Sequence, residues 1–94
     1  MFLKTNLKWL RKRKNRTQEE VAFALAMKRA TYSGYETGVG EPSLEKLLTI
    51  ARYFRITLDG LVKTDLRTIS EREYQELLQA DNFKWEQKDA GSNN

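Results

Sequence analysis

Apolar residues recur at helical intervals along this chain, and few residues interrupt them. The clearest stretch covers residues 44–54, where apolar side chains fall at positions i, i+3, i+4, i+7 and i+10: Leu44, Leu47, Leu48, Ala51 and Phe54. This spacing places them on one face of a helix. The 94 residues include only five glycines and one proline, which favours short connections between elements. Because no convincing alternating run typical of a β-strand is present, we expect an all-α protein.

Capping residues indicate where the helices begin. Thr17 and Ser70 are each followed three residues later by a glutamate, the capping-box pattern in which the two side chains bond to each other's backbone amides. Ser43 and Thr57 are further N-cap candidates. We expect helices over about 5–14, from 18 to a turn near 26, and over 29–37, 44–54, 58–63 and from 71 onward. Residues 64–68 should form a connector, and residues 90–94 a frayed tail.

Composition excludes several classes of protein. The chain has no cysteine and no histidine, which excludes disulfides, a serine–histidine–aspartate triad and an ordinary zinc site. No apolar run approaches the ~20 residues that a membrane helix needs. We therefore expect a cytoplasmic protein with no membrane association and no cofactor. An enzyme has little support, because a small helical chain offers little room for a ligand-sized cleft.

Positive charge is concentrated at the start of the chain. The net charge is +4, and residues 1–16 hold seven basic residues and no acidic one, whereas residues 66–94 hold four basic and six acidic residues. A basic segment of this kind attracts anions such as nucleic acid. Within it, Lys12, Arg13 and Lys14 are expected to form a solvated face.

The second and third expected helices are separated by only a few residues, with the small Ala22 and Ala26 near their junction. Two helices joined by a tight turn form a helix-turn-helix. In this motif the second helix lies in the DNA major groove and its first residues contact base edges. Lys28 and Arg29 stand at the front of that helix and could donate to guanine O6 and N7.

The segments LKWLRKRKN, TQEEVAFALAMKRATYSGYETG, EPSLEKLLTIARYF and ITLDGLV resemble the helix-turn-helix family of phage repressors and Cro, also called the XRE family. The match runs from about Asn6 to about Val62. It implies a five-helix lambda-repressor-like helix-turn-helix domain in residues 1–65. Residues 66–94 would add a C-terminal helical extension, a possible dimerisation element.

The resemblance also implies which residues bind DNA. Two positions match phosphate contacts and five match positions along the recognition helix: Gln18 and Thr31 for the first group, and Lys28, Arg29, Ala30, Ser33 and Gly34 for the second. Arg11 and Glu36 match a structural ion pair between the first and third helices. Glu36 is the only acidic residue between Glu20 and Glu41.

The chain departs from the family pattern at several positions. Ala26 replaces the usual turn glycine, and an alanine in a left-handed conformation there would cost up to ~1 kcal/mol. Arg16 replaces a commonly apolar residue. The loop of residues 39–41 lacks the basic residues that often contact phosphate, so Lys28 and Arg29 should dominate recognition.

Apolar side chains continue into the C-terminal extension: Tyr74, Leu77, Leu78, Phe83 and Trp85. They could pack on their own domain or pair two subunits, and we slightly favour the second because the five-helix unit is complete by about residue 63.

The preferred interpretation is a sequence-specific DNA-binding transcriptional regulator, acting as a repressor. It would bind a palindromic double-stranded operator as a homodimer. Two alternatives stay open. The chain could be the antitoxin of a toxin–antitoxin pair, with a protein partner bound through residues 66–89, or a protein-interaction module that has lost DNA binding.

Overall fold

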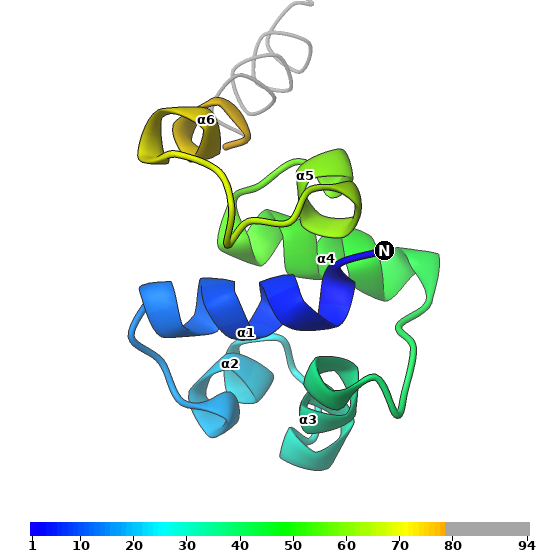
Figure 1. Ribbon diagram of the computed structural model, residues 1–94. Helices are drawn as coiled ribbons and strands as arrows, with labels where there is room; N and C mark the ends of the chain where they lie inside the picture. The colour runs from blue at the N-terminus through cyan, green and yellow to red at the C-terminus, as the bar shows by residue number, and fades with distance from the viewer. Residues whose placement is uncertain (79–94) are drawn as a thin grey trace, which may run out of the picture.

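The computed structural model describes residues 1–78 as an assembly of helices (Figure 1). The predictions for Phe83, Trp85 and the tail of residues 90–94 lie outside this range. The helices are α1 (Leu3–Arg13), α2 (Gln18–Ala24), α3 (Arg29–Thr37), α4 (Leu44–Phe54), α5 (Leu58–Lys63) and α6 (Glu71–Glu76). Over residues 1–78 the only β-type pairing is an isolated bridge between Ile56 and Leu78, so the all-α prediction is confirmed.

The helices begin at the predicted caps. The capping boxes at Thr17 and Ser70 both form, with each hydroxyl accepting from the backbone amide of the glutamate three residues later. The hydroxyls of Ser43 and Thr57 cap α4 and α5 in the same way. Only α1 begins earlier than expected, at Leu3 instead of Thr5. A tertiary contact explains this start, because the Phe2 amide donates to the Val62 carbonyl at 2.9 Å.

Helix α1 lies between the α2–α3 pair and the α4–α5 pair (Figure 1). Leu7 of α1, Tyr32 of α3 and Ile50 of α4 are completely buried, so one apolar core joins both sides of α1. Because α1 contacts α3 and α5 directly, its position fixes that of α3. No helix in the described part of the chain is long and apolar enough to cross a membrane.

A buried polar residue on α1 holds the chain that follows α5. The Asn6 amide nitrogen donates to the carbonyls of Leu61 at 2.7 Å and Thr64 at 2.6 Å, and its oxygen accepts from the Leu66 amide at 3.1 Å. These bonds satisfy backbone groups that burial would otherwise leave unpaired, at a cost of about 1–3 kcal/mol each. The side chain therefore acts as a structural clip between α1 and the connector.

Helix α6 packs against the basic end of α1. The rings of Tyr74 and Trp9 meet edge to face with centroids 5.3 Å apart. The Arg13 guanidinium lies 4.2 Å from the centre of the Tyr74 ring and pairs with Glu71 at 2.6 Å. Arg13 is exposed, as expected of a solvated face, but it also contacts an aromatic ring and a carboxylate, which the sequence did not indicate.

The chain leaves α6 earlier than predicted. The helix ends at Glu76, because the next residues turn back to α5: the Thr57 amide donates to the Leu77 carbonyl at 2.8 Å, and Leu78 bridges to Ile56. Tyr74, Leu77 and Leu78 all pack against the core of their own domain, which was one of the two interpretations of these side chains. Subunit pairing through residues 66–89 stays a prediction.

Candidate nucleic-acid interface

The turn between α2 and α3 sets the direction of the recognition helix. Ala26, which stands where the family usually has a glycine, adopts a left-handed conformation with φ of 57°. The Met27 amide then donates to the Ala22 carbonyl at 2.9 Å, which folds the chain back over the end of α2. Leu25 is buried and Met27 half-buried, so the turn is anchored in the core. Lys28 is extended and occupies the N-cap position without a side-chain capping bond, and α3 begins at Arg29.

The two sides of α3 differ completely in exposure. Tyr32 and Tyr35 are buried against the core. The four candidate DNA-binding residues at the front of the helix are all exposed: Lys28, Arg29, Ala30 and Thr31. The structure therefore brings two positive charges and a hydroxyl together on one solvent-facing turn.

The later candidate positions on α3 are less open. Ser33 and Gly34 are half-buried. The Gly34 carbonyl accepts from the amides of Gly38 at 3.0 Å and Gly40 at 3.1 Å. The loop after α3 thus folds over the end of the helix at Gly34, so this residue is less open to solvent than the front turn.

An ion pair fixes α3 from behind. The Arg11 Nε donates to Glu36 Oε2 at 2.7 Å and Nη2 donates to Oε1 at 3.2 Å. The Glu36 side chain is only 3% exposed. Gln18 completes the cluster, because its Nε2 donates to Glu36 Oε1 at 3.0 Å. The first residue of α2 is thereby tied to the last turn of α3. The sequence pattern predicts the pair of Arg11 and Glu36 but not Gln18 as the third member of this cluster.

Hydrogen bonding keeps this cluster charged. Burial by itself would raise the pKa of Glu36, but hydrogen bonds from Arg11, Tyr32 and Gln18 outweigh it and lower that pKa below its ordinary value. The same bond to Glu36 raises the pKa of Arg11. Burial raises the pKa of the neighbouring Tyr32 hydroxyl, so it stays neutral. The ion pair is therefore intact at neutral pH.

A basic hollow lies between the starts of α2 and α3. Its volume is about 460 Å³, and three arginines and one acidic residue are among the side chains around it: Arg11, Arg16, Thr17, Gln18, Glu19 and Arg29. This position suits an anionic oxygen such as that of a phosphate. In the sequence, Arg16 stands out only as a departure from the family pattern, and no local signal shows that the fold places it at the same hollow as Arg29.

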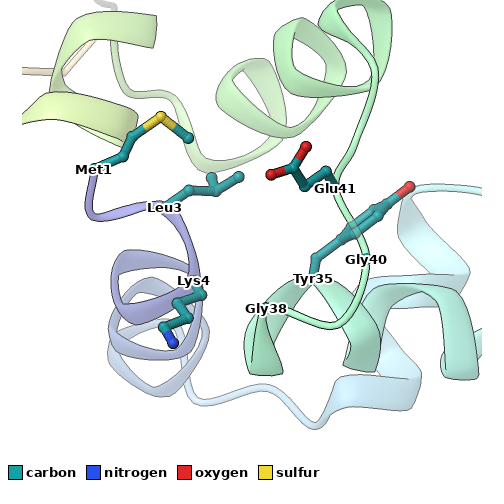
Figure 2. A pocket seen from close by; sticks show the side chains of 7 residues that line it. All are labelled: Met1, Leu3, Lys4, Tyr35, Gly38, Gly40 and Glu41. Atoms are coloured by element: carbon teal, nitrogen blue, oxygen red, sulfur yellow. The ribbon is translucent and has the colours of Figure 1, made fainter.

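A second, smaller cavity lies between the start of α1 and the loop after α3 (Figure 2). Its volume is about 150 Å³, below the range of about 300–1,000 Å³ typical of ligand pockets. Lys4 lies alongside Gly38, and the Glu41 carboxylate points towards Leu3 (Figure 2). We interpret this cavity as a packing gap between α1 and the loop, not as a ligand site. Residues 1–78 contain no cluster of His, Cys, Asp or Glu side chains able to hold a metal ion.

Comparisons with known proteins agree with this geometry. Residues 7–61 match the family described as Helix-turn-helix. The transcriptional activator BcrR of Enterococcus faecalis is 38% identical over 74 residues, which cover 78% of this chain and 36% of BcrR. The cryptic phage CTXphi transcriptional repressor RstR of Vibrio cholerae is 36% identical over 61 residues, covering 65% of this chain and 54% of RstR.

The chain thus spans between about a third and just over half of the length of these two relatives. A crystal structure of a transcriptional regulator from Listeria innocua shares the fold, with a TM-score of 0.59, 23% identity, and coverage of 94% of this chain and 92% of that one. Since the family match includes more than half of the chain, this protein belongs to the helix-turn-helix family of the phage repressor and Cro type.

Proposed function

We propose that the protein is a sequence-specific DNA-binding regulator of transcription. The observation that carries this proposal is the front turn of α3, where Lys28 and Arg29 are exposed beside each other while the Arg11–Glu36 pair holds the far end of the helix from behind. A rigidly supported helix with basic side chains at its start is suited to the major groove. The named functions of the matched relatives, which are transcriptional regulators, support the same conclusion.

In the proposed complex, Lys28 and Arg29 contact base edges, where a good bidentate pair contributes about 1–3 kcal/mol of discrimination. Thr31 and Gln18 lie towards the phosphates, and the basic hollow that contains Arg16 receives one of them. Ser33 and Gly34 contribute less, because the loop after α3 covers this end of the helix. Phosphate contacts fix the register of the protein on DNA, whereas base contacts fix the sequence.

We further propose that two copies bind a palindromic operator, with recognition helices about one turn of DNA, ~34 Å, apart. Such a protein acts in the cytoplasm, on the nucleoid. Repression is the simpler output, because it requires only that the protein occupy a promoter, and RstR is named a repressor. BcrR is named an activator, so a promoter fusion with the operator inside or upstream of the core promoter distinguishes the two outputs. The relatives named here give no support to the antitoxin alternative or to an enzymatic role.

Selection from a random duplex pool tests the proposal. Fluorescence anisotropy is measured at several salt concentrations before and after rounds of selection. We expect affinity to fall steeply with salt, because binding releases counterions from the phosphates, and we expect selection to enrich a palindrome. Absence of binding even at low salt, or binding that selection never improves, would contradict sequence-specific recognition.

A further inference from the structure

Exposed apolar side chains gather at one end of α4. Six large hydrophobic residues are exposed among residues 1–78. Three of them lie close together in the chain: Leu44 at 64% and Leu48 at 47% on α4, and Val39 at 88% in the preceding loop. Leu44 and Leu48 lie four positions apart, at i and i+4, so they are on the same side of the helix. The core side of α4, formed by Ile50, Ala51 and Phe54, leaves this side without a partner inside the described domain.

Charges flank this apolar surface in a self-complementary order. Glu41 and Glu45 lie at its N-terminal end, and Arg52 lies one turn beyond Leu48. All three side chains are exposed, and none of them belongs to the ion pairs found within residues 1–78. If a second α4 ran antiparallel across a two-fold axis near Leu48, Glu45 of each copy would face Arg52 of the other. A surface that matches itself in this way is the requirement of an isologous dimer contact.

We propose that this side of α4, formed by Leu44, Leu48, Glu45 and Arg52, is the contact between two copies of the chain. The inference deepens the proposed function, since a palindromic operator needs two copies. The loop of residues 38–43 joins this end of α4 directly to the end of α3 (Figure 1). Contact here therefore couples the positions of the two recognition helices through a short connection.

The size of the surface determines how strong the contact is. A stable interface usually involves about 20–30 residues on each side, and this one centres on two apolar side chains, Leu44 and Leu48. The dimer is therefore weak in free solution and becomes populated when two half-sites hold two copies close together. An experiment on this contact must therefore detect weak pairing of two copies, and it must not depend on DNA binding alone.

A single engineered cysteine provides that test, because the natural chain has none. In the full chain, Leu48→Cys places a thiol near the expected two-fold axis. The control, Phe23→Cys, places one on α2 at a residue that is more accessible still, since Phe23 is 86% exposed and Leu48 47%. We expect Leu48→Cys to form a disulfide-linked dimer on mild oxidation, with higher yield on the selected duplex, and Phe23→Cys to form little. Equal yields from the two variants, with and without DNA, would overturn the proposal.

Charge reversal tests the antiparallel geometry in the Leu48→Cys background. Glu45→Arg and Arg52→Glu each place like charges opposite each other, which disfavours the contact, so each alone should lower the yield of linked dimer at least about fivefold. The double variant should restore it. A double variant that stays as low as either single variant would exclude this pairing.

Adding Arg29→Glu separates this inference from the proposed function. That change should abolish DNA binding and leave the yield of linked dimer in free solution unchanged. If Leu48→Cys does not link although the protein binds a palindrome, the contact lies elsewhere and the proposed function stands. If the dimer links but no duplex is bound, the interface stands and the proposed function fails.

Discussion

The two sides of α3 have the same backbone but different neighbours. Tyr32, Tyr35 and Glu36 face the core, where burial and the Arg11 guanidinium hold them. Lys28 and Arg29 are exposed to solvent and belong to none of the ion pairs found in the described part of the chain. Surface charges without partners usually change stability by less than about 0.5 kcal/mol, whereas breaking a buried pair costs about 3–5 kcal/mol. The inner side therefore determines stability and orientation, and the outer side is free to determine sequence preference.

Glu36→Gln should have the largest effect on stability. It leaves the partly buried Arg11 guanidinium without a counter-charge, so the free energy of unfolding at pH 7 should fall by about 3 kcal/mol. Glu71→Gln is the matched control, since Glu71 pairs with Arg13 but its side chain is 60% exposed, and an exposed pair contributes at most about 1 kcal/mol. Urea denaturation measures both, and equal losses would show that burial of the inner pair has no special role.

The stabilisation that Glu36 provides should depend on pH, and its sign can be predicted. Hydrogen bonds lower the pKa of Glu36 below its ordinary value of 4.5, so the unfolded chain binds its proton more readily than the folded protein does. The stabilisation is therefore complete above about pH 4.5 and is lost as the pH falls through the folded pKa. The difference in unfolding free energy between wild type and Glu36→Gln should shrink in acid, and a constant difference from pH 7 to pH 3 would contradict this account.

Two glycines at the end of α3 should respond oppositely to the same substitution. Gly38 has a φ of 86°, and a Cβ there would lie 3.1 Å from Lys4 Cδ, so Gly38→Ala should lower stability by about 1–2 kcal/mol. Gly34 is helical, and its Cβ would lie an ordinary 3.6 Å from the Gly40 nitrogen. Gly34→Ala should therefore gain about 0.5–1 kcal/mol. Thermal or urea unfolding measures both, and changes of the same sign would show that the loop is not packed over α3 as described.

Ala26→Gly should have the smallest effect. The left-handed conformation of Ala26 disfavours a side chain, so glycine should stabilise the protein by up to about 1 kcal/mol, less the entropy that it adds to the unfolded chain. Ala30→Gly, inside α3, should instead destabilise it. A loss of stability at Ala26 would mean that its methyl group contributes more through packing than the backbone conformation costs.

Local signals predicted much of the fold. Capping boxes at Thr17 and Ser70 depend only on residues three positions apart, and both formed. The Asn6 clip was not predicted, because a polar residue beside apolar ones normally indicates a surface position, and its partners lie more than fifty residues away. The early end of α6 likewise follows from a long-range pairing of Leu78 with Ile56.

The candidate site shows the same division between local and long-range information. Its outer residues occupy fixed positions in the helix-turn-helix pattern, so the resemblance was sufficient to place Lys28 and Arg29. The supporting contacts depend on how three helices meet. The bond from Gln18 to Glu36 and the approach of Arg16 to the basic hollow follow from that packing, which spacing along the sequence does not encode.

Charge reversal at Arg29 tests the division between the two sides of α3 most directly. Arg29→Glu and Arg72→Glu, an exposed position on α6, are compared with the wild type by urea unfolding and by anisotropy on the selected duplex. We predict that both variants unfold within about 0.5 kcal/mol of wild type. Arg29→Glu should lose at least about 100-fold in affinity, since it removes a base contact and repels DNA, and Arg72→Glu should lose far less. An Arg29→Glu protein that binds the duplex as tightly as Arg72→Glu would contradict the assignment of the outer side of α3 to DNA.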